Sequence, residues 1–147
     1  PGVDLLLASY LFEKPTLFGS RYSRLDNDTE DFYTFNDTPG KPFGSKKPVY
    51  VLTSSMTYSA AEAFTYCLQD LKRATVVGER TRGGAHPVIA IAINERFWMG
   101  LPYARAIGPV SKRDWEGTGV IPDISVPAGD ALAAALRDAA SRIKGTG

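Results

Sequence analysis

The spacing of apolar residues changes several times along the chain, and each change predicts an element. Dense apolar residues over 3–12 predict a short helix, closed by Pro15. Apolar and polar residues alternate over 16–36, and the turn-rich DNDTED at 26–31 between the two runs predicts a hairpin. A similar alternation over 88–101, with NER in its middle, predicts a second hairpin.

The stretch from residue 49 to residue 84 predicts the organising unit of the domain. The β-branched run Val49–Leu52 predicts a buried strand, residues 59–72 a helix, and residues 74–77 a second strand. Two parallel strands joined by a helix bind ligands just beyond the carboxyl ends of the strands, beside the N-terminus of the helix. Ser59 is therefore expected at the place where chemistry gathers.

The remaining segments predict connections and a closing helix. Residues 39–48, rich in Gly, Pro and Lys, are expected to form an exposed connection, and residues 110–123, with two glycines and a proline, a loop. The tail over 128–144 has apolar residues at helical spacing, at Leu132, Ala135, Leu136, Ala139 and Ile143. The whole chain is expected to form one α/β domain, residues 1–147.

Composition narrows the class of protein. With 147 residues, 44% hydrophobic and 22% charged, the chain fits one ordered domain and neither a disordered segment nor a membrane span. The net charge is only +1 and the basic residues form no continuous stripe, so nucleic acid is not an expected partner. The single Cys67 excludes an internal disulfide and a cysteine zinc cluster, and we expect it to be a buried apolar residue. Because the chain opens on PGVDLLLASYLF, like the interior of a domain, we expect a fragment of a longer protein.

Ser59 has two interpretations. A serine hydroxyl between a strand and a helix can attack a carbonyl group, while backbone N–H groups, that of Ala60 among them, stabilise the oxyanion. Ser59 and Glu62 also have the spacing of a capping box, in which the serine serves only to start the helix. The pattern alone favours the capping box, since the spacing identifies no base for the serine.

Other candidate residues are equally open to a structural interpretation. His86, the only histidine, is a general base or substrate contact if it lies in the site, and otherwise a hydrogen-bonding residue near a turn. Glu116 could orient a histidine or bind a substrate amine, or could hold its own loop, as Asp114 could. Trp98 and Trp115 are expected in the core or in a pocket wall.

Three segments in a fixed order carry a family resemblance: TSSMTYSAAE, RATVVGERTRGGA and WEGTGVIPD. Together they resemble the tail-specific, or C-terminal processing, serine peptidases. The later stretch LPYARAIGPVSKRDWEGTGVIPD is similar to the branch that includes the interphotoreceptor retinoid-binding protein and bacterial peptidase-like relatives. The resemblance implies a crotonase-like fold of repeated strand–strand–helix units, here with added β-hairpins.

The resemblance also implies roles for single residues. Ser59 aligns with the nucleophile, and the oxyanion hole with the N–H groups of Ala60 and Gly2. The lysine that serves as base in the tail-specific branch aligns with Gly84, so a Ser–Lys dyad is missing. A second arrangement in the family pairs the serine with an upstream histidine and a glutamate that matches Glu116. The base would then come from sequence outside this chain, and the isolated piece should be inactive.

Two functions follow as expectations. The first is a serine-type peptidase domain that cleaves unstructured or C-terminal segments of a peptide or protein substrate. We expect it to need no metal or organic cofactor. Whether it forms a homo-oligomer is not decided by the sequence. The second is a non-catalytic module for an apolar or peptide ligand, motivated by Gly84 and by the apolar hairpin over 88–101, which could wall a pocket. Relatives act mostly outside the cytoplasm, which implies a periplasmic or extracellular location.

Overall fold

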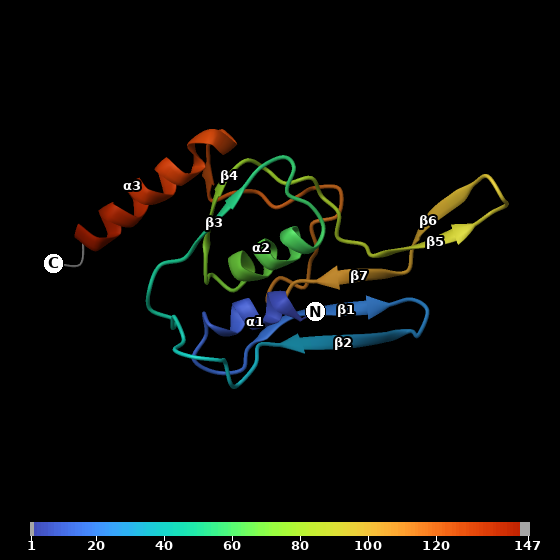
Figure 1. Cartoon of the computed structure of the whole chain (residues 1–147), viewed down its shortest axis with the longest axis horizontal. Helices are drawn as coiled ribbons and strands as arrows, with labels where there is room; N and C mark the ends of the chain where they lie inside the picture. Colours follow the sequence, from blue (N-terminus) through green and yellow to red (C-terminus); the bar gives the residue numbers. More distant parts are fainter. Residues whose placement is uncertain (1, 145–147) are drawn as a thin grey trace.

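The computed structural model describes residues 2–144 (Figure 1). Its helices and strands are, in chain order, α1 (Val3–Ser9), β1 (Leu17–Ser23), β2 (Asp28–Tyr33), β3 (Tyr50–Thr53), α2 (Ala60–Asp70), β4 (Thr75–Gly78), β5 (Val88–Ala92), β6 (Trp98–Pro102), β7 (Ala104–Ile107), β8 (Ile124–Ser125), the 3-10 turn η1 (Ala128–Asp130) and α3 (Ala131–Lys144). The domain is therefore mixed α/β, as predicted.

The predicted strand–helix–strand unit is confirmed. Strands β3 and β4 pair in parallel from Tyr50 opposite Thr75 to Thr53 opposite Gly78, and α2 connects them. Strand β8 adds to the other side of β4, which gives the order β3-β4-β8. The prediction of a fully buried strand is wrong for β3, because β3 lies at the edge of this sheet and leaves Leu52 exposed.

The first predicted hairpin is also confirmed, with a shorter turn. Strands β1 and β2 pair antiparallel, and β7 pairs with the other edge of β1. The ladder already begins at Ser23 opposite Asp28, so only the first two residues of DNDTED lie in the turn and the other four belong to β2. Asn27, with a φ of 51°, supplies the left-handed residue that closes the turn.

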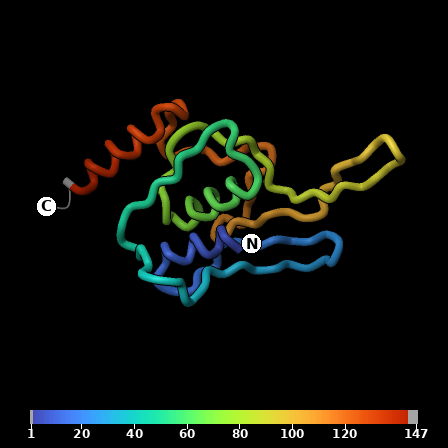
Figure 2. Tube along the Cα trace, viewed as in Figure 1, coloured from blue at the N-terminus to red at the C-terminus, as the bar shows by residue number. Residues whose placement is uncertain are grey.

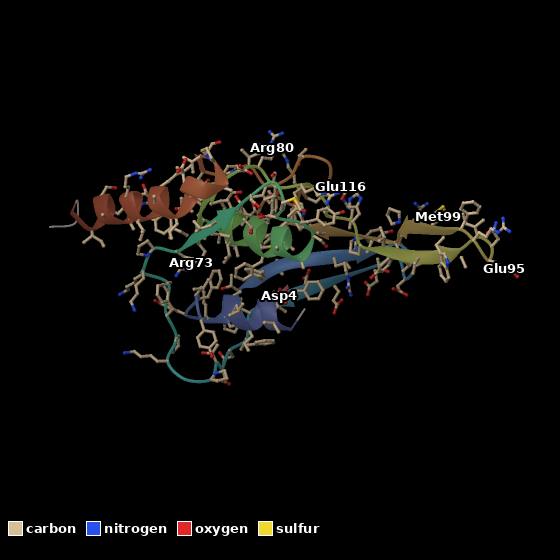
Figure 3. All side chains as sticks on the ribbon, turned by 45° about the horizontal axis from the view of Figure 1, so that its top comes forward. Asp4, Arg73, Arg80, Glu95, Met99 and Glu116 are labelled. Carbon is tan, nitrogen blue, oxygen red and sulfur yellow. The ribbon has the colours of Figure 1, made fainter. Side chains whose placement is uncertain are left out.

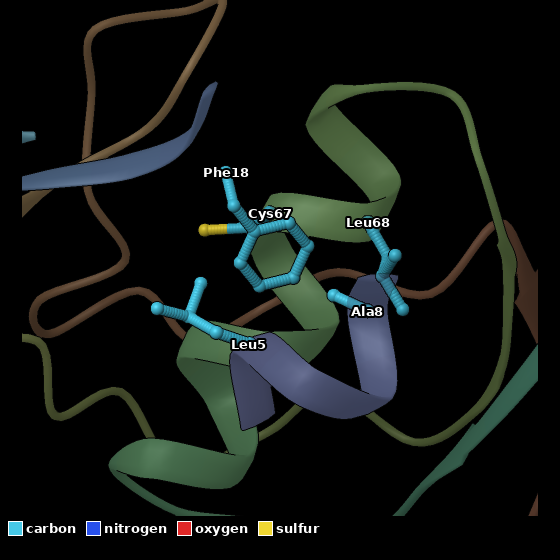
Figure 4. Packing of buried hydrophobic residues seen from close by; sticks show 5 residues of the cluster. All are labelled: Leu5, Ala8, Phe18, Cys67 and Leu68. Atoms are coloured by element: carbon cyan, nitrogen blue, oxygen red, sulfur yellow. The ribbon is translucent and has the colours of Figure 1, made fainter. Parts of the chain in front are cut away.

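The core forms where α2 meets α1 and β1. Figure 4 shows its buried side chains, which are Leu5, Ala8, Phe18, Cys67 and Leu68. Helix α1 ends at Ser9, earlier than the apolar run suggested, and the chain then turns towards β1. Cys67 is a free, buried cysteine as expected, and burial, with smaller effects from Asp70 and Asp4, raises its pKa to about 12. The thiol is thus neutral and packs as an apolar group.

The closing helix is confirmed, and of its predicted apolar positions Ala135 is buried whereas the larger ones are not. The side chains that pack against Val77 are Ala131, Ala134 and Ala135, whereas Leu132, Leu136 and Ile143 are exposed. Small side chains let the helix lie close to β4, so burial follows the alanines rather than the larger residues. In the tube view of Figure 2, α3 extends away from the rest of the domain.

The second hairpin is confirmed as the antiparallel pair β5 and β6. It extends beyond the body of the domain, as Figure 1 shows. Trp98 is 69% exposed, so the expectation that it lies in the core or in a pocket wall is wrong, whereas Trp115 is buried.

Candidate active site

Ser59 lies in a strained turn between β3 and α2. Its φ of 54° and ψ of −117° match the first central position of a type II′ turn, a position that favours glycine. The N–H of Ala61 donates to the carbonyl of Tyr58 at 3.2 Å and closes this turn. An ordinary N-cap residue has an extended backbone and needs no such conformation. The strain therefore fits a serine whose exposed side chain is held in a particular direction.

The capping box is present as well, and Glu62 does more in it than start a helix. Its carboxylate is fully buried and accepts four hydrogen bonds. Oε2 accepts from the N–H groups of Ser59 at 2.8 Å and Gly84 at 2.9 Å, and Oε1 accepts from the N–H of Gly83 at 2.7 Å and from the Thr81 hydroxyl. One side chain thereby joins the serine turn to the loop that follows β4.

The balance of forces on Glu62 keeps it charged. Burial, the largest single effect, raises the pKa, but the hydrogen bonds from Thr81, Gly84, Gly83 and Ser59 together outweigh it and lower the pKa below its ordinary value of 4.5. Glu62 is thus a buried anion whose charge is shared among four donors.

Glu116 lies in the loop between β7 and β8 and holds the 83–86 loop from its other side. Its Oε2 accepts from the N–H groups of Ala85 at 2.6 Å and His86 at 2.9 Å. Its own N–H donates to Asp114 Oδ1 at 3.0 Å, so Asp114 is a residue that holds this loop locally. Glu62 and Glu116 therefore fix four consecutive amides, those of residues 83–86.

His86 has a carboxylate beside each ring nitrogen. Nε2 lies 3.4 Å from Asp114 Oδ2, and Nδ1 lies 3.8 Å from Glu116 Oε2. Among residues 2–144 the structure records no hydrogen bond between the imidazole and Ser59. His86 is thus a histidine beside Glu116 within this chain, whereas the pairing of Glu116 with an upstream histidine stays a prediction.

Tyr58 covers Gly84, the residue that the resemblance aligns with the family's lysine. A Cβ atom placed on Gly84 would lie 2.4 Å from the Tyr58 ring. The Tyr58 ring also lies under the guanidinium of Arg82, at 5.1 Å from its centroid. A longer side chain at residue 84 would therefore start in space that Tyr58 already fills.

Ser59 borders a cavity of about 250 Å³. Ala60, Gly84 and His86 line it too, so the structure brings together three of the predicted site residues and the aligned lysine position. Most of the wall is apolar and comes from α1, α2, β1, β2, β7 and nearby loops, at Leu5, Phe18, Phe32, Ala63, Phe64, Cys67, Ala85, Pro87, Ala106, Ile107 and Trp115.

Gly2 and Glu116 do not line this cavity. Gly2 precedes α1, and its carbonyl accepts from the N–H of Leu6 at 3.1 Å, while Asp4 and Leu5 of the same helix reach the cavity wall. The hairpin residues 88–101 do not line it either, so the expectation that this hairpin walls the pocket is wrong.

Two contributors to the site were not predicted. The sequence predicts Glu62 only as a capping residue, and its spacing gives no sign that it also binds the Gly83–Gly84 loop. Tyr58 immediately precedes the serine, and only the three-dimensional structure brings it onto Gly84.

Between residues 2 and 144 no helix is long and apolar enough to cross a membrane. Over the same part of the chain, no group of three or more His, Cys, Asp or Glu side chains is placed to hold a metal ion.

Solved structures share this fold. The photosystem II D1 C-terminal processing protease superposes with a TM-score of 0.65 at 20% identity, over 84% of this chain and 31% of its own. A candidate peptidase from Parabacteroides merdae superposes with a TM-score of 0.72 at 24% identity, over 92% of this chain and 46% of its own. A lipoprotein from Streptococcus agalactiae superposes with a TM-score of 0.65 at 18% identity, over 92% of this chain and 48% of its own. The chain thus spans between about a third and a half of these proteins.

The family model of peptidase family S41 matches residues 5–126. The match includes the serine turn, the loop held by Glu62 and Glu116, and the strands that carry them. This chain therefore belongs to peptidase family S41.

Proposed function

We propose that the chain is the nucleophile-bearing part of a serine peptidase, with Ser59 as the acyl-accepting residue. The observation that carries the proposal is the strained type II′ conformation of Ser59 at the start of α2, beside a cavity and tied by its own N–H to buried Glu62. The family's crotonase-like architecture supports the same placement by resemblance.

The chemistry follows from this position. The Ser59 hydroxyl attacks a peptide carbonyl, a base takes its proton, and the oxyanion of the tetrahedral intermediate accepts hydrogen bonds. The Ala60 N–H belongs to the first turn of α2, whose amides have no acceptor within the helix. The Gly2 N–H is the second donor by resemblance. Collapse of the intermediate releases the amine, which takes the proton from the base, and leaves an acyl-serine that water hydrolyses to the acid and free Ser59.

The base is the missing part of the proposal. Gly84 stands at the lysine position, and the His86 ring nitrogens face Asp114 and Glu116. We therefore assign the base to a histidine outside this chain, with Glu116 as its orienting carboxylate. Substrates would be unstructured or C-terminal protein segments in the periplasm or outside the cell, a location supported only by the resemblance and by the lipoprotein among the similar structures.

The test is labelling with a fluorophosphonate, which modifies activated serines. Ser59→Ala should abolish labelling, whereas Ser55→Ala, an exposed serine in the same loop, should not. Labelling of the 147-residue chain should be slow and should accelerate when imidazole is added as an external base, but only when Ser59 is present. Equal labelling of the wild type and Ser59→Ala would refute Ser59 as the nucleophile.

The cavity also supports a second candidate, a module that binds an apolar ligand without catalysis. Its apolar wall and the absence of a lysine at Gly84 favour this function. Its volume of about 250 Å³ lies below the 300–1,000 Å³ usual for small-molecule sites, which suits a single substrate side chain better. Saturable binding of an apolar fluorescent probe that survives Ser59→Ala, with no labelling of the wild type, would favour the binding module.

A further inference from the structure

Both faces of the hairpin over residues 88–102, here called the hairpin arm, are apolar: Val88 and Trp98 lie exposed on one, and the other carries a continuous row of large side chains. The register places Ile89 opposite Leu101 and Ile91 opposite Met99, so these side chains share a face. Ile93 and Phe97 continue it towards the turn, where the Ile93 N–H donates to the Phe97 carbonyl at 2.9 Å. We call this surface the arm face, and its members are Ile89, Ile91, Ile93, Phe97, Met99 and Leu101.

The arm face is large for a surface left in water. Apart from Ile89, its members are between 37% and 63% exposed. Taken over side chains of roughly 200 Å² each, these exposures leave on the order of 500 Å² of apolar surface in water, as much as the largest apolar patch on a typical monomer, which is often functional. A standard interface buries about 800 Å² per partner, a little over half of it apolar, so the arm face alone supplies the apolar part of one side.

The arm is also preorganised for contact. Asn94 Oδ1 accepts from the N–H groups of Arg96 at 2.9 Å and Phe97 at 3.0 Å, which locks the turn. Figure 3 shows Met99 on the arm and Glu95 at its end, well away from Glu116. The arm therefore presents its face without an ordering step that would weaken binding.

The charges of the arm indicate what covers this face. Within residues 88–102 the charged side chains are Glu95 and Arg96, adjacent and of opposite sign at the turn. A net charge of zero gives anionic lipid, nucleic acid or a charged peptide nothing to attract. When two such arms meet about a two-fold axis, tip to tip, Glu95 of each copy faces Arg96 of the other, as an isologous contact requires.

From this geometry we propose that the arm face is a self-association surface, through which two copies of this chain pack face to face with their tips together. Strand β5 of one copy then lies over β6 of the other, so Ile91 packs against Met99 of the second copy. The two faces meet at the spacing of packed sheets, roughly 10 Å. This inference is independent of the proposed catalytic role of Ser59.

Sedimentation velocity of the 147-residue chain over a wide concentration range tests the proposal. We expect a reversible monomer–dimer equilibrium. Ile91→Lys should raise the dissociation constant on the order of tenfold or more, because a charge would be buried at the centre of the interface. Val110→Lys, at an exposed apolar residue outside the arm, should leave it unchanged. Circular dichroism checks that each variant is folded.

Reversal of the charges at the turn supplies a second test, which leaves the apolar residues of the arm face unchanged. Glu95→Arg should weaken association because it places like charges together, and the double variant Glu95→Arg/Arg96→Glu should restore it. A monomer at every concentration, a dimer unaffected by Ile91→Lys, or a double variant no better than the single one would each overturn the proposal. So would a monomer that co-sediments with phosphatidylcholine vesicles, since lipid would then cover the face.

Discussion

Glu62→Gln is the substitution that best tests how the serine turn is held. In the wild type, each of the two Glu62 carboxylate oxygens accepts two hydrogen bonds. Gln keeps one oxygen as an acceptor and replaces the other with an amide group that donates. If the amide nitrogen takes the place of Oε2, it faces the N–H groups of Ser59 and Gly84. If it takes the place of Oε1, the Gly83 N–H loses its acceptor. Either orientation leaves buried donors without a partner.

The magnitude follows from these losses. Each buried donor without a partner costs about 1–3 kcal/mol, and the remaining bonds lose the extra strength of a charged acceptor, so the total is on the order of 3–5 kcal/mol. This is a large fraction of the roughly 5–15 kcal/mol by which domains are stable. Urea unfolding followed by circular dichroism measures it. The matched control is Glu30→Gln, which removes an exposed ion pair with Arg21 and should cost less than about 1 kcal/mol.

The role of Glu62 also predicts how the free energy of unfolding changes with pH. Since folding lowers the pKa of Glu62, its contribution is complete above its ordinary value of 4.5 and is lost as the pH falls through the folded value. The free energy of unfolding of the wild type should therefore fall more steeply below about pH 4.5 than that of Glu62→Gln. A Gln variant within 1 kcal/mol of the wild type at pH 7, with a parallel pH profile, would refute the view that this carboxylate holds the turn.

Three further predictions concern glycines and the cysteine. Gly78→Ala should destabilise the domain by several kcal/mol in urea unfolding, because its Cβ would lie 2.1 Å from a backbone oxygen of β3 at a φ of 133°, whereas Gly100→Ala, in open space, should be close to neutral. Gly84→Ala should cost only about 1 kcal/mol, since the half-exposed Tyr58 ring can swing away, and Tyr58→Ala should remove that cost in a double-mutant cycle. Cys67, buried and with its pKa raised to about 12, should react with iodoacetamide only after unfolding; rapid reaction of the folded protein would contradict its burial.

The elements were largely predictable because each has a local cause. The apolar run that forms β3, the capping box at α2 and the alternation in both hairpins are local signals, and all four elements are present. The buried face of α3 was not predictable, because it depends on how closely the helix approaches β4. The alanines at 131, 134 and 135 allow that approach, and no periodicity of large residues reports it.

The site was predictable only in part, for the same physical reason. The position of Ser59 between a strand and a helix is local, and so is the cap formed with Glu62. The other two hydrogen-bonding regions of Glu62, at Thr81 and at Gly83–Gly84, depend on the return of the chain after β4. Exposure of the hairpin arm is likewise a tertiary property, since alternation predicts a strand and says nothing of what covers it.

The contact between Tyr58 and Gly84 bears on where the base comes from. A Cβ at residue 84 would lie 2.4 Å from the Tyr58 ring, so Gly84→Lys alone cannot place an amine beside Ser59 unless that ring moves. Tyr58 and Gly84 therefore act as a pair, and a base has to approach the serine from another direction. The exposed side of Ser59 and the carboxylate of Glu116, 42% exposed, leave such an approach open. Because Gly84→Lys first has to displace the Tyr58 ring, it should accelerate fluorophosphonate labelling less than Tyr58→Ala/Gly84→Lys does; equal acceleration by the two would show that the ring does not hinder the lysine position.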